Sequence, residues 1–167
     1  MLLALAACGD ASSPSNDAAP DMDAASEMDA SSDTSMDMQE MIEPTFELTV
    51  GTGQNAFEPL DAEGELVLER GPQGLQHVYV SLRAPLAEGF HTIDLSITVG
   101  DRVISAPTRV NAPFLSVPGE DFVEMVGQLV VVPEPNGALG VPGTLRAQVE
   151  PSGGGFGLVD REVQVRW

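Results

Sequence analysis

The chain has 167 residues and a formal net charge of −19, from 26 acidic residues and seven basic ones. All the basic residues are arginines and none precedes Arg70, so the chain lacks the clustered Lys and Arg side chains that neutralise nucleic-acid phosphates or anionic lipids. Cys8 is the only cysteine, which excludes an intramolecular disulfide. No run of about 18 apolar residues follows Cys8, which excludes a transmembrane helix there. The length predicts one folded domain.

The N-terminus is a short apolar run, Met1–Ala4, followed by Leu5-Ala6-Ala7-Cys8. An aliphatic residue, two small residues and a cysteine in this order resemble the lipobox of bacterial lipoproteins. The resemblance implies that a peptidase cuts before Cys8, that the cysteine receives diacylglycerol, and that its freed amine is acylated with a fatty acid such as palmitate. Two or three acyl chains hold a protein on a membrane stably, whereas one chain binds only marginally.

The residues beside Cys8 refine this expectation. We expect residues 1–7 to be a signal-peptide remnant. Because no Lys or Arg precedes Cys8, Met1 is expected to lie inside a longer signal peptide with a basic start. In Gram-negative lipoproteins an Asp directly after the lipidated cysteine tends to retain the protein in the inner membrane. Gly9 stands there instead, so the resemblance implies the outer membrane and leaves open which face carries the domain.

Residues 8–44 are expected to form the lipidated cysteine and a disordered acidic linker. Gly9–Pro44 contains ten acidic residues and no basic one, and the remainder is mostly Ala, Ser, Pro and Met. Such a composition cannot bury enough apolar surface to offset the entropy of ordering, and as a flexible coil it would span roughly 30–36 Å. A Cu(I) site built from thioethers is the alternative, and a solvated spacer is preferred; the candidate ligands are Met22, Met28, Met36, Met38 and Met41.

Residues 45–167 show the period-two alternation of half-buried strands. The expected strand segments are 46–50, 65–69, 77–83, 92–99, 103–104, 122–132, 145–149 and 159–167. Gly51-Thr52-Gly53 is expected to break the first strand, Gly71–Gly74 to form a turn, and Gly127 to mark a bulge. Phe114 and Leu115 stand between two prolines, which predicts an edge segment.

Eight or nine short strands with turn signals every 8–12 residues predict an all-β domain, an antiparallel β-sandwich, after the disordered N-terminal tether. The domain resembles the immunoglobulin-like domains of bacterial surface proteins in architecture. It lacks the Cys…Trp…Cys framework of true immunoglobulin domains.

The best candidate for a binding face is the polar row of segment 77–83. Val78, Val80 and Leu82 are expected to face the core, and the opposite row is expected to be exposed: His77, Tyr79, Ser81 and Arg83. Tyr and Arg are enriched where interfaces carry binding energy. An ordinary outer sheet face is the competing interpretation. We expect the Trp167 side chain to pack into the core at the last strand rather than to form a sugar-binding surface.

Catalytic and metal sites find little support. The sequence has no Gly-x-Ser-x-Gly elbow, and His77 and His91 are expected on opposite faces, so we expect no enzyme activity, no catalytic residue, no metal site and no cofactor. Blue copper needs a cysteine thiolate, but Cys8 is assigned to the lipid. Loop calcium is an open alternative to solvated acidic turns, at Asp61-Glu63-Glu65, Glu120-Asp121 and Asp160-Glu162.

These features together predict a membrane-anchored lipoprotein that displays a non-enzymatic β-sandwich binding or interaction module at the cell envelope. Its expected partners are the membrane, through Cys8, and a protein or a glycan, but not nucleic acid. Two alternatives remain: a structural envelope protein without a small ligand, and a Ca²⁺-stabilised adhesion-type domain.

Overall fold

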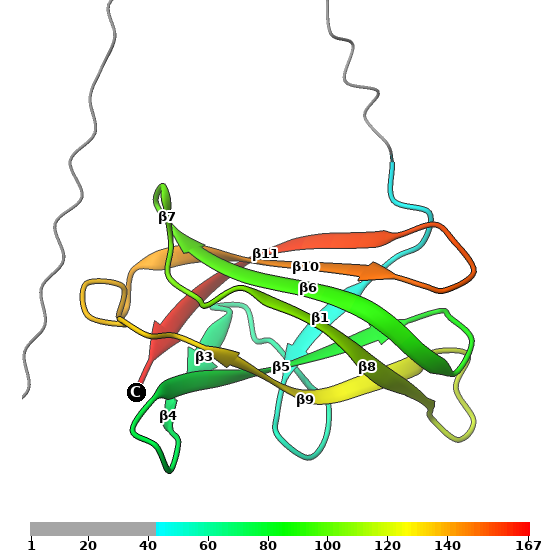
Figure 1. Ribbon diagram of the computed structural model, residues 1–167, viewed down its shortest axis with the longest axis horizontal. Helices are drawn as coiled ribbons and strands as arrows, with labels where there is room; N and C mark the ends of the chain where they lie inside the picture. The colour runs from blue at the N-terminus through cyan, green and yellow to red at the C-terminus, as the bar shows by residue number, and fades with distance from the viewer. Residues whose placement is uncertain (1–42) are drawn as a thin grey trace, which may run out of the picture. The chain divides into compact units, whose positions relative to one another are not determined.

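A computed structural model describes residues 43–167, and this part of the chain is all-β (Figure 1). It contains no helix long and apolar enough to cross a membrane within the described range. Its eleven strands are β1 (Thr49–Thr52), β2 (Glu58–Pro59), β3 (Glu65–Val67), β4 (Glu69–Arg70), β5 (Gln76–Ala84), β6 (Gly89–Val99), β7 (Arg102–Val103), β8 (Thr108–Ser116), β9 (Val123–Val131), β10 (Pro142–Glu150) and β11 (Gly157–Arg166).

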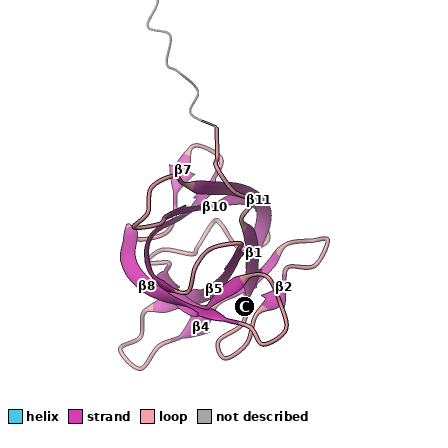
Figure 2. Cartoon of the chain, turned by 90° about the vertical axis from the view of Figure 1, so that its right-hand side faces the viewer, coloured by secondary structure: helices cyan, strands magenta, loops and turns pink. Residues whose placement is uncertain are grey.

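The strands form one sheet in the order β2-β1-β5-β9-β8-β6-β10-β11-β3, with β4 paired to β5 and β7 paired to β6. Every pairing is antiparallel except that of β11 with β3. Viewed end-on, the sheet curls into a half-barrel around the core (Figure 2). The predicted all-β class is therefore confirmed.

Strand β8 connects the two halves of the curled sheet, which are β2-β1-β5-β9 and β6-β10-β11-β3. It pairs with β6 from Thr108 to Phe114, and then with β9 through Leu115 and Ser116. The prediction of an edge segment at Phe114-Leu115 is therefore wrong: β8 lies between β9 and β6 in the sheet, these two residues mark its change of partner, and Phe114 is fully buried. Pro113 pairs with Phe90 of β6 just before this change of partner.

The alternation seen in the sequence fills the core. Inward positions of β5, β6 and β10 are almost completely buried, namely Val78, Val80, Leu82, Ile93, Leu95, Ile97, Leu145, Ala147 and Val149. Apolar burial of this kind contributes about 25 cal/mol per Å². The core stabilises the curled sheet from inside and leaves the opposite face of each strand for polar side chains.

The segment expected as one strand at 65–69 is divided between the two halves of the sheet. Leu66 lies in β3, which pairs in parallel with β11, whereas Glu69 lies in β4, which pairs with β5. Leu68 stands between them, buried, and its N–H donates to the carbonyl of Arg166. Leu66 and Leu68 face the core as predicted, but the backbone passes from β11 to β5 between Leu68 and Glu69.

The expected break at Gly51-Thr52-Gly53 is wrong for its first two residues. Gly51 and Thr52 belong to β1 and pair with Pro59 and Glu58 of β2. A Cβ at Gly51 would lie 2.6 Å from the ring of Phe57. The missing side chain is what allows the Phe57 ring to lie over the strand.

Two predicted turn features are confirmed. At Gly71–Gly74 the N–H of Gly74 donates to the carbonyl of Gly71 over 2.9 Å, and Gly74 has a φ of 82°. At Gly127 the pairing of β5 with β9 shifts register, so that one residue of β5 faces two of β9. Gly127 has a φ of 72°, a left-handed conformation that suits a bulge glycine.

Candidate functional site

The predicted row on β5 is only partly accessible. Tyr79 and Arg83 are partly exposed, but His77 is 6% exposed and Ser81 is completely buried. The prediction of an exposed row is therefore wrong for His77 and Ser81. Alternation correctly puts all four side chains opposite the core row, but other segments of the chain cover two of them.

Ser81 lies under the loop that joins β1 to β2. Its hydroxyl donates to the carbonyl of Gly53 over 3.1 Å and accepts the N–H of Gly127 over 3.0 Å. A Cβ at Gly127 would collide with the carbonyl oxygen of Gln54. Ser81 therefore ties the β1–β2 loop to the bulge of β9, and this loop separates Tyr79 from Arg83.

Arg83 is held by its neighbours. Its guanidinium lies 3.9 Å from the ring centroid of Phe57 and 4.7 Å from that of Phe122. Its Nε is 2.5 Å from Oε1 of Glu124, and the Arg83 side chain is 33% exposed. Cation–π contacts on two rings and one ion pair satisfy this group within the domain. Arg83 thus fastens Phe57 and Phe122 to β5 rather than standing free for a ligand.

Tyr79 and Arg83 line two separate hollows, and that of Tyr79 is the larger. The Tyr79 hollow has a volume of about 440 Å³ and lies between the β1–β2 hairpin and β3–β4. It is lined by Thr52, Gly53, Gln54, Asn55, Ala56, Glu58, Val67, Glu69 and Tyr79. The Thr52 hydroxyl donates to the Tyr79 carbonyl over 2.9 Å, and the His77 ring meets the Tyr79 ring edge-on at a centroid distance of 5.1 Å.

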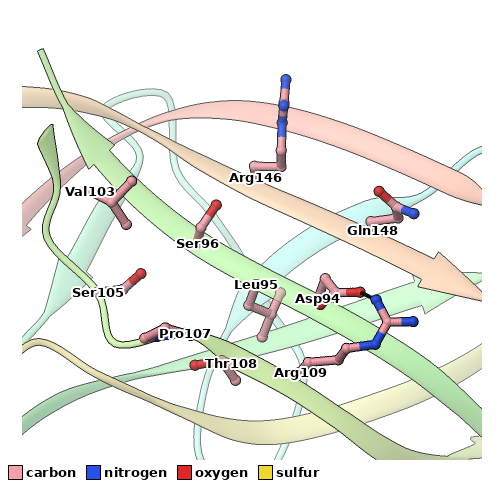
Figure 3. A pocket seen from close by; sticks show the side chains of 10 residues that line it. All are labelled: Asp94, Leu95, Ser96, Val103, Ser105, Pro107, Thr108, Arg109, Arg146 and Gln148. Carbon is pink, nitrogen blue, oxygen red and sulfur yellow. Dashed lines mark hydrogen bonds and ion pairs between the residues drawn. The ribbon is translucent and has the colours of Figure 1, made fainter. Parts of the chain in front are cut away.

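A second groove, of about 340 Å³, lies over β6, β8 and β10 (Figure 3). Val103, Leu95 and Pro107 contribute apolar surface to it. Arg109 binds Asp94 over 2.5 Å and Glu150 over 2.9 Å, which crosslinks these strands. Sequence reasoning missed this groove because its residues come from strands that become neighbours only in the folded sheet.

Beside this groove, Arg146 and Asp160 form a two-pronged ion pair. Nε of Arg146 donates to Oδ1 of Asp160 over 2.8 Å, and Nη2 donates to Oδ2 over 2.7 Å. The hydrogen bond from Arg146 lowers the pKa of Asp160, and the same bond raises the pKa of Arg146. Both side chains are largely exposed, so the pair contributes modestly to stability.

His77 and His91 lie on different strands and pack against different residues. His91 is buried on the same side of β6 as Ile93 and Leu95, and its Nε2–H donates to the carbonyl of Ala87 over 2.9 Å. Its ring packs against Phe114 at a centroid distance of 5.3 Å. Within residues 43–167, no three His, Cys, Asp or Glu side chains are grouped to hold a metal ion.

Several carboxylates considered for calcium have partners within the domain. Oδ1 of Asp61 accepts the N–H groups of Glu63 and Glu65 over 3.0 and 3.3 Å. Glu63 and Glu65 lie 3.7 Å from the guanidinium of Arg166. Asp61, Glu63, Glu65 and Asp160 thus each have a partner within the domain.

The expected core position of Trp167 is wrong. Its side chain is 57% exposed, and the guanidinium of Arg70 lies 6.0 Å from its ring. β11 ends at Arg166, so Trp167 follows the last strand and extends past the core.

Cys8, the lipobox and the five methionines lie outside the described residues. Comparison of the chain with protein-family models, with curated proteins and with solved structures found no match.

Proposed function

We propose that this protein is a lipoprotein, anchored through acyl chains on Cys8, that displays its β-domain at the cell envelope. The observation that carries the proposal is the order of segments in the chain. Leu5-Ala6-Ala7-Cys8 is followed by an acidic tract without a basic residue, and then by the β-domain. An acidic chain without lysine has little electrostatic affinity for anionic lipid, so acyl chains would have to provide the attachment.

The first residues of the β-domain are hydrogen-bonded to it, which suits attachment from the N-terminal side. The N–H of Thr45 donates to the carbonyl of Phe156 over 2.8 Å, and the Thr45 hydroxyl and the Phe156 N–H also share a hydrogen bond of 3.0 Å. A pull on the N-terminal side would therefore load a hydrogen-bonded contact with the turn before β11.

The proposed role of the domain is non-enzymatic binding of a protein or glycan partner, without a cofactor. The hollow under Tyr79 supports this role, because it is concave and combines an aromatic ring with polar side chains. The rival proposals are a structural envelope protein and a Ca²⁺-stabilised adhesion-type domain. The engagement of Asp61, Glu63, Glu65 and Asp160 by partners of the domain argues against the calcium alternative.

We further propose that the curled sheet is a two-layer, immunoglobulin-like sandwich. The partner change of β8 supports this description, because it divides the strands into a β2-β1-β5-β9 layer and a β6-β10-β11-β3 layer around one core. The outer membrane is the proposed location, since Gly9 rather than Asp follows Cys8.

Metabolic labelling tests the anchor. Cells that express the chain are grown with an alkyne-tagged fatty acid, and the protein is probed by coupling a dye to the alkyne. We expect the wild type and Ser12→Ala to be labelled and Cys8→Ser to carry no label. Equal labelling of Cys8→Ser would overturn the proposal. The fatty acid would then be attached to a residue other than Cys8, the only cysteine of the chain.

A further inference from the structure

We propose that the hollow under Tyr79 binds an aliphatic primary amine, as a linear diamine or as the side chain of a lysine. This assignment rests on the proposed role of the β-domain as a binding module, and it names the chemistry that the module would recognise. The hollow of about 440 Å³ falls within the size range of small-molecule sites.

The distribution of arginines distinguishes this hollow from four other hollows of the domain. Four further hollows each have an arginine in their lining: Arg109 and Arg146 in the groove of Figure 3, and Arg102, Arg83 and Arg161 in the remaining three. The lining of the Tyr79 hollow has two carboxylates, Glu58 and Glu69, and no basic residue. The lining of this hollow is therefore negatively charged.

Glu58 and Glu69 take part in none of the ion pairs of the described residues. The domain uses its arginines to neutralise other carboxylates, as in Arg83–Glu124, Arg109–Asp94 and Arg146–Asp160. Within residues 43–167, neither Glu58 nor Glu69 has a basic side chain within 4.0 Å. Both glutamates are exposed, so they are hydrated and ready to pair with an ammonium group.

The uncharged part of the lining suits the rest of an alkylamine. The ring of Tyr79 is an aromatic partner for a cation, and such a contact acts within about 6 Å of the ring centroid. Val67 is 51% exposed and offers an aliphatic wall for a methylene chain. Gln54 and Asn55 add amide oxygens that can accept hydrogen bonds from an ammonium.

The hollow is built from fixed parts. The Tyr79 carbonyl accepts the Thr52 hydroxyl, and the β1–β2 loop is tied to Ser81 through the carbonyl of Gly53. The His77 ring lies edge-on to the Tyr79 ring at 5.1 Å. A site that is already ordered loses less conformational entropy when a ligand binds.

Titration of the full 167-residue chain with cadaverine, followed by NMR of a ¹³C-labelled tyrosine ring, tests the proposal. Tyr79 is the only tyrosine, so the labelled signals report on this hollow alone. We expect saturable shifts with cadaverine and none with pentanediol, its uncharged counterpart. An acetylated lysine amide is the second probe. Tighter binding of cadaverine would identify a free diamine as the natural ligand, and tighter binding of the lysine amide would identify a lysine side chain.

Variants assign the binding to the two carboxylates. We expect Glu58→Gln/Glu69→Gln to weaken the binding about tenfold or more. Glu120→Gln/Asp121→Asn removes the same charge from an exposed turn outside the hollow and should change the affinity less than about twofold because of solvent screening. Circular dichroism of both variants checks that they fold.

Absence of a saturable shift with both amines would overturn the assignment, as would equal weakening by the two double variants. Neither result bears on the anchor at Cys8, which fatty-acid labelling tests separately. A failure of the amine site can therefore be told apart from a failure of the proposed lipid anchor.

Discussion

Thr45 is hydrogen-bonded to Phe156, 111 residues later in the chain, through both its backbone and its hydroxyl. This contact joins the first residues of the β-domain to the turn that precedes β11. Gly157 allows the close approach, because a Cβ there would collide with the ring of Phe46. The N-terminal end of the domain is thus held by the last hairpin of the sheet.

Replacement of the Thr45 hydroxyl by a methyl group should weaken this contact. Thr45→Val leaves the Phe156 N–H without its hydroxyl acceptor, and we expect a loss of about 1 kcal/mol in the free energy of unfolding. Urea denaturation measures this change. Thr49→Val is the matched control, because the Thr49 side chain is exposed in β1. Equal stability of the two variants would contradict a role for the Thr45 hydroxyl.

The bulge at Gly127 predicts a steric effect beyond the usual cost of a left-handed residue. Gly127→Ala places a Cβ against the Gln54 carbonyl, whereas Gly137→Ala, at a φ of 85°, meets no atom within 4 Å. Left-handed backbone costs a non-glycine residue about 1–2 kcal/mol. We expect Gly127→Ala to lose at least about 1 kcal/mol more than Gly137→Ala in thermal or urea unfolding. Equal losses would mean that the β1–β2 loop moves away freely.

Ser81 should be a structural residue rather than a ligand contact. Ser81→Ala leaves the Gly127 N–H without its hydroxyl acceptor, so we expect a loss of about 1–3 kcal/mol in unfolding free energy. Ser116→Ala is the control, because its hydroxyl binds Glu88 on the exposed surface. A destabilisation by Ser81→Ala no larger than that of the control would contradict this role.

The Arg146–Asp160 pair predicts a small pH dependence. Because Arg146 lowers the pKa of Asp160 in the folded chain, the ionised pair stabilises the fold above the ordinary aspartate pKa of about 3.9. That contribution disappears as the pH falls through the lowered value in the folded state. Asp160→Asn should therefore be less stable than wild type at neutral pH, by less than about 1 kcal/mol because the pair is exposed.

The same comparison at acid pH provides the check. Once Asp160 is protonated, wild type and Asp160→Asn should unfold at similar denaturant concentrations, and high salt should reduce the gap at neutral pH. A difference that stays constant across this range would show that the pair has no electrostatic role.

Alternation in the sequence was enough to predict the all-β class and the inward rows of β5, β6 and β10. It correctly assigned Val78 and Ile93 to the core, since a period of two separates the faces of a strand without knowledge of its neighbours. It could not predict the burial of Ser81, because the covering loop is placed by the tertiary fold. The division of 65–69 at Leu68 has the same cause, since alternation does not identify the pairing partner of a strand.

The candidate site was harder to predict for a related reason. Tyr79 was found from its strand position, but Glu58, Val67 and Glu69 reach the same hollow from other strands. Phe57 and Phe122 contact Arg83 from separate loops. A single sequence carries no signal that brings such residues together before the strand order is known.

Membrane fractionation of wild type and Cys8→Ala, combined with protease treatment of intact cells, tests the central claim most directly. We expect the wild type in the membrane fraction and Cys8→Ala in the fraction without membranes, because acyl chains on Cys8 would provide the attachment. Digestion of the wild type on intact cells would place the domain on the outer surface, and protection would place it in the periplasm. Retention of Cys8→Ala in the membrane fraction would contradict the lipid anchor and the account built on it.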